Sequence, residues 1–191
     1  MADTTDFRNG FTMIYNGDVW QIIEFMHVKP GKGGAFVRTK LKNVRDGRVV
    51  DNTFRAGEKV KEARVERRQY QFLYEDDLGL HFMNTEDYSQ TSLRPEQVGK
   101  REFIKEGGVI DVLFHAETEE PLTTEMAKSV ELEVAETDPG LRGDTATGAT
   151  KPATLESGAV VQVPLFIDEG DVIRVNTDTG EYVTRVSTAK A

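Results

Sequence analysis

Two lysine side chains stand in a stretch whose other residues carry almost no chemistry of their own. The stretch is Lys29-Pro30-Gly31-Lys32-Gly33-Gly34, between two strand-like runs at residues 19–28 and 35–44. Pro30 stiffens the entry to the stretch, and its glycines let a partner approach the backbone closely. The composition predicts a tight, exposed turn that offers the primary amine of Lys32 at its tip.

Nucleotide binding is the first chemistry that such a loop suggests, and the spacing does not support it. A Walker-type loop needs Gly-Lys-Ser/Thr at the start of a helix, whereas Gly33 follows Lys32 and a strand-like run comes next. The dinucleotide fingerprint fails too, because Phe36 stands where a third glycine is needed. We therefore expect no nucleotide and no other cofactor. A plain hairpin turn and a functional contact loop both remain open.

The run after the loop has a basic face. Arg38, Lys40 and Lys42 alternate with less polar residues, as in a strand that is buried on one side. Residues 1–64 carry 12 Lys and Arg against 8 Asp and Glu, although the whole chain has a net charge of −9. A basic head of this kind can dock on phosphates. An ordinary solvated face explains the same alternation, so both interpretations stay open.

Catalytic and metal chemistry find little support in the sequence. His27, His81 and His115 are scattered, one on each of three expected strands, and none has a partner at metal-binding spacing. The chain has no cysteine and no Gly-x-Ser-x-Gly elbow, so the common nucleophile motifs are missing. We expect neither a catalytic site nor a metal site. An enzyme that acts on a phosphorylated small molecule lacks any supporting motif.

The elements that must hold these residues are strands. Two-residue alternation between turn pairs recurs, and helical periodicity is hard to find, which predicts an all-β chain. Strand density and length favour three small β-barrel domains, at residues 1–64, 65–128 and 129–191, the first of them SH3-like. We expect one short helix from Pro95, a bend at Pro121 and an irregular segment from Asp138 to Lys151. The expected strands are 12–15, 19–28, 35–44, 48–54, 65–74, 80–83, 109–115, 129–137, 159–163, 171–176 and 181–186.

The expected location is the cytoplasm. The sequence has no run of roughly 20 apolar residues that could span a membrane. The acidic start, Met1 to Asp6, lacks the apolar core of a signal peptide.

Two stretches resemble the bacterial translation elongation factor P family. Residues 29–36 look like the modification loop of that family. The run from Asp138 to Thr145, with residues 151–166 and 180–183, looks like its C-terminal signature. The resemblance covers essentially the whole chain. It implies an L-shaped, tRNA-like protein with an SH3-like (KOW-like) domain followed by two oligonucleotide-binding (OB-fold) barrels.

The resemblance also implies a role and a set of site residues. A protein of this family binds the ribosome between the P and E sites, next to peptidyl-tRNA or initiator tRNA, and relieves stalling at consecutive prolines. It implies that a lysine-modifying enzyme extends Lys32, whose arm then reaches the CCA end of the tRNA. The implied tRNA- and ribosome-binding residues are Lys29, Pro30, Gly31, Lys32, Gly33, Gly34, Arg38, Gly143, Asp144, Thr145, Tyr182 and Arg185.

These implied contacts differ in what they touch. Gly143, Asp144 and Thr145 match a loop near the small subunit and the E-site codon, and Tyr182 and Arg185 match positions against the tRNA stem. The peptide bond is made by the ribosome, so the resemblance implies an accessory factor and not an enzyme. We expect a monomer with no membrane partner. The alternative is a general single-stranded RNA-binding barrel protein, which predicts salt-sensitive binding to free RNA.

Overall fold

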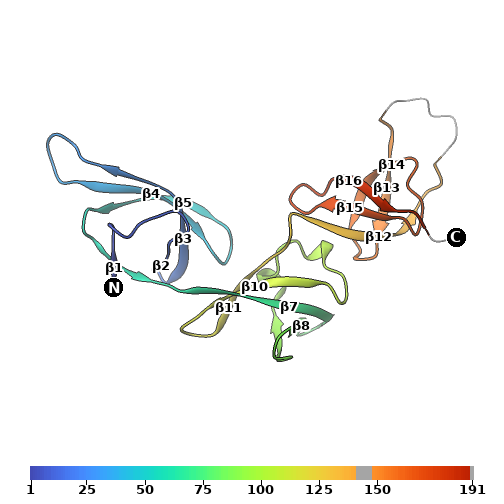
Figure 1. The fold of residues 1–191 in the computed structure, drawn as a ribbon, viewed down its shortest axis with the longest axis horizontal. Helices are drawn as coiled ribbons and strands as arrows, with labels where there is room; N and C mark the ends of the chain where they lie inside the picture. The colour runs from blue at the N-terminus through green and yellow to red at the C-terminus, as the bar shows by residue number, and fades with distance from the viewer. Residues whose placement is uncertain (141–147, 190–191) are drawn as a thin grey trace. The chain divides into compact units, whose positions relative to one another are not determined.

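The protein is all-β, as the alternation of its sequence predicts. The computed structural model describes residues 1–140 and 148–189. These residues form three sheets and two short 3-10 helices (Figure 1). The chain divides into two compact units: unit 1 holds Met1–Arg68 and Asp111–Thr124, and unit 2 holds Gln69–Ile110 and Glu125–Ala191. The domain boundaries near residues 64 and 128 and the L shape stay predictions.

The first sheet is antiparallel and lies in unit 1, in the order β1-β6-β2-β3-β4-β5. Its long hairpin pairs β3 with β4 from Trp20 opposite Asn43 to Val28 opposite Phe36, with a bulge at Ile23. The strands are β1 (Ala2–Asp3), β2 (Thr12–Tyr15), β3 (Asp18–Val28), β4 (Phe36–Asn43), β5 (Val49–Arg55) and β6 (Lys59–Glu62).

An aromatic core holds this hairpin in place. Phe7 meets Phe54 edge to face, with ring centroids 5.2 Å apart, and Tyr15 meets Trp20 in the same way at 6.1 Å. Val37 and Leu41 of β4 are fully buried against this cluster. Burial of side chains of this size stabilises the fold by about 1.5–3 kcal/mol each. The inner face of β4 is thereby anchored, and its alternate residues must point outward.

The second sheet has the order β11-β10-β7-β8-β9. Its strands are β7 (Val65–Asp76), β8 (Gly79–Asn84), β9 (Gln90–Leu93), β10 (Val109–His115) and β11 (Glu120–Glu125). Between β9 and β10 lie the 3-10 helices η1 (Pro95–Gln97) and η2 (Arg101–Phe103), where the sequence predicts one short helix from Pro95. Pro121 was expected to bend the chain. It lies instead within β11, which is an edge strand of its sheet, and edge strands tolerate proline.

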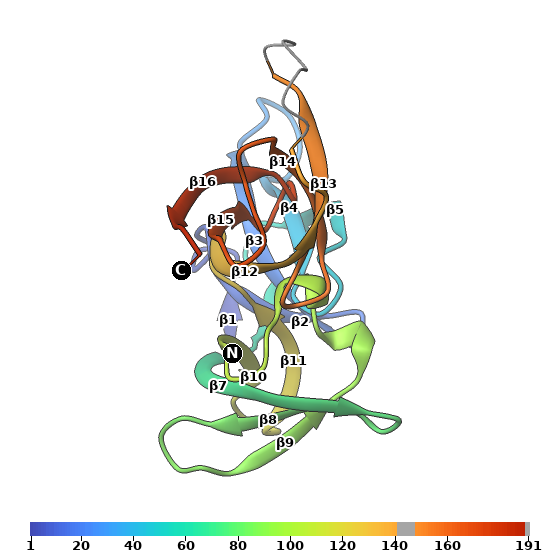
Figure 2. The ribbon, with the colours of Figure 1, turned by 90° about the vertical axis from the view of Figure 1, so that its right-hand side faces the viewer.

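The third sheet lies in unit 2 and has the order β14-β13-β12-β15-β16. Figure 2 shows these strands curving around a common interior, which is filled by a cluster that includes Leu132, Val163 and Ile173. The strands are β12 (Ser129–Thr137), β13 (Thr150–Leu155), β14 (Val160–Pro164), β15 (Val172–Asn176) and β16 (Tyr182–Ser187). β13 is a correction, because it begins inside the segment expected to be irregular and contains Pro152.

Candidate functional site

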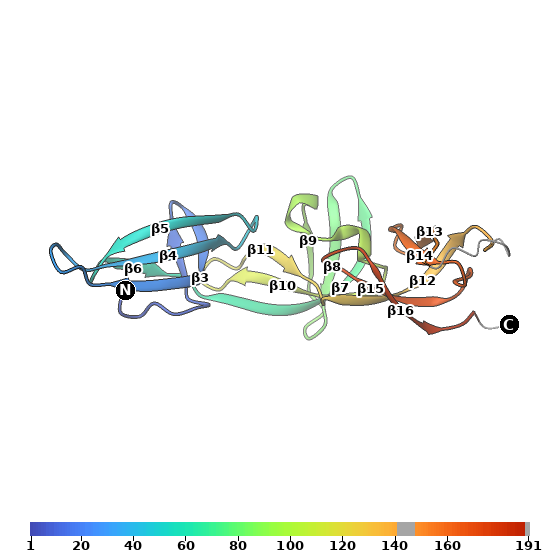
Figure 3. The ribbon, with the colours of Figure 1, turned by 90° about the horizontal axis from the view of Figure 1, so that it is seen from above.

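The loop at residues 29–35 connects β3 to β4 and projects beyond the other strands of unit 1 (Figure 1, Figure 3). All its residues are exposed except Ala35, which is half-buried. Gly33 has φ +106°, a conformation that L side chains rarely adopt. A Cβ added at Gly31 or Gly34 would meet nothing within 4 Å. Packing inside the protein therefore does not require small residues there, and the space they leave is open to a partner.

Lys32 stands in this open space. It forms no hydrogen bond or ion pair with any residue that the structure describes, and neither does Lys29. An ammonium group on a flexible stem with no protein partner can reach a phosphate, a ribose or an enzyme that modifies it. The geometry thus offers an accessible amine, and no described residue holds it by a hydrogen bond or ion pair that could activate it for catalysis.

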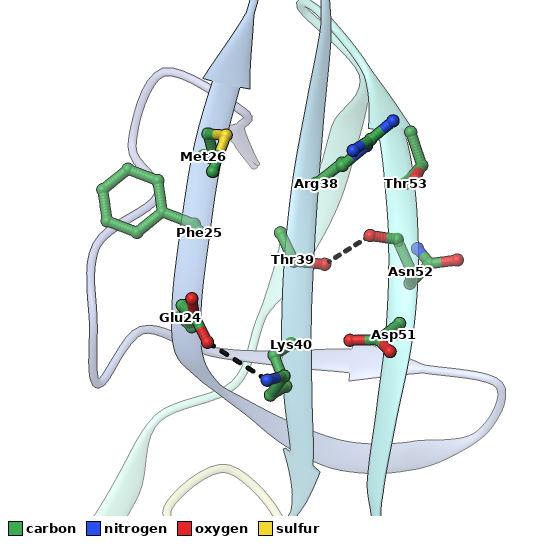
Figure 4. Close-up of a pocket in the computed structure, with 9 residues that line it drawn as sticks. All are labelled: Glu24, Phe25, Met26, Arg38, Thr39, Lys40, Asp51, Asn52 and Thr53. Carbon is green, nitrogen blue, oxygen red and sulfur yellow. Dashed lines mark hydrogen bonds and ion pairs between the residues drawn. The ribbon is translucent and has the colours of Figure 1, made fainter.

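The outer face of β3, β4 and β5 follows directly from the loop. In the register of these strands Met26 lies opposite Arg38 and Arg38 opposite Thr53, while the next row places Lys40 between Glu24 and Asp51. Figure 4 shows both rows, and an open hollow of about 410 Å³ is lined by the nine residues drawn there. The inner side of β4 is fixed by Thr39, whose hydroxyl donates to the carbonyl of Asn52 at 3.0 Å.

The cations on this face are not equivalent. The Nζ atom of Lys40 lies 3.2 Å from a carboxylate oxygen of Glu24. Arg38 has no carboxylate partner among the described residues, and its guanidinium lies 5.6 Å from the ring centre of Phe36. The predicted basic face is therefore present, but the charge of Lys40 is partly offset. Arg38 is the cation closest to the loop on β4 that stays available to an anion.

The remaining predicted residues belong to the third sheet. Gly143, Asp144 and Thr145 lie outside the described residues. Tyr182, at the start of β16, is half-buried and packs against the core of that sheet. Arg185, further along β16, lies over the ring of Phe166 and donates from Nη1 to a carboxylate oxygen of Asp171 at 3.3 Å. Arg185 is therefore held by the protein, unlike Lys32.

Asp171 is the buried member of this group, with 2 % of its surface exposed. Burial raises the pKa of the Asp171 carboxyl, but the N–H groups of Asp168 and Ala189 and the side chain of Arg185 donate to it. These donors outweigh burial and hold the pKa of Asp171 below its ordinary value. Sequence patterns indicate no special role for either Asp171 or Phe166, because Asp171 begins the expected strand 171–176 and Phe166 ends the matched run 151–166.

Metal and membrane features can be stated for residues 1–140 and 148–189. No three His, Asp or Glu side chains in these ranges come together as a metal site would require. No helix in the same ranges is long and apolar enough to cross a membrane. His115 is buried with Nδ1 2.8 Å from the hydroxyl of Thr118, and His81 lies 2.8 Å from Asp76, so both have structural partners.

Three family models together match most of the chain. The Elongation factor P (EF-P) KOW-like domain matches residues 3–60, the Elongation factor P (EF-P) OB domain residues 65–123, and the model named Elongation factor P, C-terminal, residues 130–185. The matches correspond to the three sheets, in chain order. They agree with the predicted SH3-like and OB-fold classes.

Similar proteins match over nearly their full length. The chain is 67 % identical over 189 residues to elongation factor P of Salinibacter ruber, covering 99 % of this chain and 98 % of the relative. It is 55 % identical over 186 residues to elongation factor P of Christiangramia forsetii, covering 97 % and 99 %. A solved structure, eukaryotic translation initiation factor 5A from Methanococcus jannaschii, aligns with a TM-score of 0.52 and 18 % identity. That alignment covers 66 % of this chain and 90 % of the solved chain and bears on the fold alone.

Proposed function

The chain belongs to the elongation factor P family, and we propose that it binds the ribosome beside the P-site tRNA and relieves stalling at consecutive prolines. As a translation elongation factor it is not an enzyme. The ribosome forms the peptide bond, and the factor changes how fast the reacting ends meet. We place this work in the cytoplasm, with the protein acting as a monomer.

One observation carries the proposal: Lys32 is exposed, without a partner in the described protein, at the tip of a loop that projects from its unit. Such a side chain stabilises nothing in unit 1 that would explain its presence. The open space around Gly31, Gly33 and Gly34 allows an RNA backbone to come close. The proposed target is the CCA end of peptidyl-tRNA or initiator tRNA.

The physical basis is positioning. Proline is a slow acceptor and a stiff donor in peptide-bond formation, so reaction geometry limits the rate. Holding the tRNA end in place lowers the entropic part of the barrier, an effect that reaches about 7–11 kcal/mol in well-oriented model reactions. Lys32 can donate hydrogen bonds to phosphate or ribose, and a covalent extension lengthens its reach. Arg38, two residues into β4, can hold the adjacent backbone.

We further propose that a lysine-modifying enzyme extends Lys32. The accessibility of its amine, the stiff entry at Pro30 and the open backbone at Gly33 favour entry of the loop into an active site. Gly143, Asp144 and Thr145 are proposed to contact the small subunit near the E-site codon, from sequence likeness alone. Tyr182 and Arg185 are proposed to contact the tRNA stem.

The test is translation of a reporter with several consecutive prolines in a system that lacks its own factor. Protein purified from its native host should restore full-length product, and Lys32→Ala should restore less than about a tenth of it. Lys59→Ala, an exposed lysine on β6, is the matched control and should act like wild type. A reporter without prolines should respond to none of them.

Intact mass and peptide mapping around residue 32 complete this test. An added mass on Lys32 supports the modification. An unshifted mass together with full activity would mean that the bare lysine is sufficient. Equal full-length product from wild type and Lys32→Ala would overturn the role given to Lys32.

A further inference from the structure

Arg185 is held by two residues from outside its own strand. Its Nη1 atom donates to the backbone carbonyl of Phe166 and to Oδ2 of Asp171, both at 3.3 Å. The carbon of the guanidinium lies 5.2 Å from the centre of the Phe166 ring. Phe166 and Asp171 both precede β15, whereas Arg185 lies on β16, so the fold brings the three together.

Asp171 is fixed in its turn by the backbone. Its Oδ1 accepts the N–H of Ala189 at 2.8 Å, and its Oδ2 accepts the N–H of Asp168 at 3.1 Å. A buried carboxylate with these donors cannot swing out to follow a mobile arginine. Asp171 therefore sets the position of the guanidinium, and not the reverse.

The Nε and Nη2 groups of Arg185 are available to a ligand. Nη1 carries two of the five N–H donors of a guanidinium, and the other three have no acceptor among the described residues. An arginine side chain normally loses rotamer entropy when it is fixed by a partner. Here much of that loss occurs on folding, so less remains to oppose binding.

Phe166 adds an exposed aromatic surface beside these donors. Its side chain is 57 % exposed although it is large and apolar. Core packing does not explain this exposure, because the interior of the sheet is filled by other residues. An exposed ring next to an arginine fork matches the two parts of a nucleotide, a flat apolar face and a phosphate.

We propose that Phe166 joins Arg185, whose tRNA contact is part of the proposed function, in a docking platform for one nucleotide unit of RNA, and that Asp171 is the positioning residue of Arg185. The guanidinium binds the phosphate, and the Phe166 ring packs against the base or the ribose. The proposal rests on the proposed function, in which the protein works on ribosome-bound tRNA. Asp168 and Glu169 lie close in sequence, so the platform acts through fixed geometry and not through a positive field.

The experiment measures the affinity of fluorescently labelled full-length protein for ribosomes that carry a P-site tRNA. Phe166→Leu keeps an apolar side chain but removes the ring, and it should weaken binding about 5-fold. Phe166→Tyr keeps the ring and should bind within about 2-fold of wild type. The matched controls are Val160→Ala, an exposed apolar residue, and Arg174→Lys, an exposed arginine on β15. Both should leave affinity unchanged.

A double-mutant cycle tests the positioning role of Asp171. Asp171→Asn should weaken binding about 5-fold in the wild-type background and less than about 2-fold in the Arg185→Lys background. A purely structural role would give the same factor in both backgrounds. If Asp171→Asn fails to fold, the comparison of Phe166→Leu with Phe166→Tyr still decides the proposal.

Chemical footprinting of the ribosomal complex identifies the occupant. Wild type should protect a short run of RNA nucleotides at the platform. Phe166→Leu should lose the protection of that run and keep the rest of the footprint. If Phe166→Leu gives the same footprint as wild type, or if position 166 crosslinks to a ribosomal protein, the proposed platform is overturned. If wild type binds no ribosomal complex at all, the proposed function fails. If wild type binds and Phe166→Leu and Asp171→Asn bind equally well, only this inference fails.

Discussion

Lys32 and Arg185 carry the same charge, but the protein holds them differently. Lys32 has no partner in the described structure, whereas Arg185 is restrained by Asp171 and Phe166. A free amine suits covalent extension and a moving target, because its position is set by the partner. A restrained guanidinium suits a fixed contact, because its direction is set before binding. The two residues therefore fit the two proposed roles, a reaching arm and a docking point.

The carboxylate of Asp171 predicts a pH dependence of stability. Its pKa in the folded protein lies below the ordinary value of about 3.9. Such a group contributes stability above its unfolded pKa, and this contribution is lost as the pH falls through the folded pKa. Asp171→Asn should lower the free energy of unfolding by about 2 kcal/mol at pH 7. The difference in the free energy of unfolding between wild type and Asp171→Asn should become smaller below about pH 4.

Urea denaturation of wild type and Asp171→Asn at several pH values between 7 and 3 measures this gap. Asp77→Asn, an exposed carboxylate in the turn between β7 and β8, is the control and should change stability little. A gap that is the same at pH 7 and at pH 3 would contradict the assignment.

The strand β4 predicts unequal roles for its two nearest cations. Arg38 has no carboxylate partner in the described residues, and Lys40 pairs with Glu24 at 3.2 Å. If this face binds RNA phosphates, Arg38→Ala should weaken ribosome binding and reduce the salt slope by about 1. Lys40→Ala should do less, because Glu24 already offsets part of the charge that Lys40 could offer to a phosphate.

Affinity measured over a series of salt concentrations separates the two variants. The slope of log affinity against log salt counts the phosphate contacts, and so distinguishes a lost contact from a distorted strand. Equal slopes for Arg38→Ala and wild type would remove Arg38 from the interface.

The same strand shows what alternation can predict and what it cannot. Period-two patterning correctly assigns Val37 and Leu41 to the core and Arg38 and Lys40 to the outer face, because successive side chains must point to opposite sides. The partner of Lys40 depends on the bulge at Ile23, which puts Glu24 opposite Lys40. A bulge depends on pairing with another strand, so no local pattern indicates it.

Proline misleads the sequence prediction in a related way. Pro121 lies in the edge strand β11, and Pro152 lies in β13 just beyond Ala153, the last residue of β13 that pairs with β12. An edge strand and the end of a paired stretch are places where a strand tolerates the proline ring. The sequence shows where the prolines are. Only the sheet order shows which neighbouring strand each of them would have to pair with.

At the scale of the whole molecule, the sequence predicts three domains, at residues 1–64, 65–128 and 129–191. Unit 2 is built by contacts between residues of the second and third of these domains. Phe103 of η2 belongs to the buried cluster of the third sheet. Lys100 pairs with Asp178, and Lys105 pairs with Glu156 at 3.0 Å. These partners are separated by dozens of residues in the chain. Composition and periodicity therefore cannot predict the contacts, and a 3-10 turn gives no periodic signal that would assign Phe103 to a core.

Phe103 therefore predicts how unit 2 unfolds. Phe103→Ala removes a buried ring whose contacts lie in unit 2, and it should cost about 3 kcal/mol there. Hydrogen exchange pulsed across a urea series follows each unit separately, through peptides from β12 and β15 and peptides from β3 and β4. The β12 and β15 peptides should lose protection at a lower urea concentration than in wild type, and the β3 and β4 peptides should shift less.

The single tryptophan, Trp20, gives an independent signal, because it is buried in the core of unit 1. Its fluorescence transition should move less than the exchange transition of β12 and β15. Val160→Ala, which truncates an exposed side chain on β14, should move neither. In Phe103→Ala, the urea midpoint of Trp20 fluorescence could move as far as the exchange midpoint of the β12 peptides. That result would mean that the Phe103 ring stabilises unit 1 as well as unit 2. Phe103 would then not act as a local link between the second and third sheets.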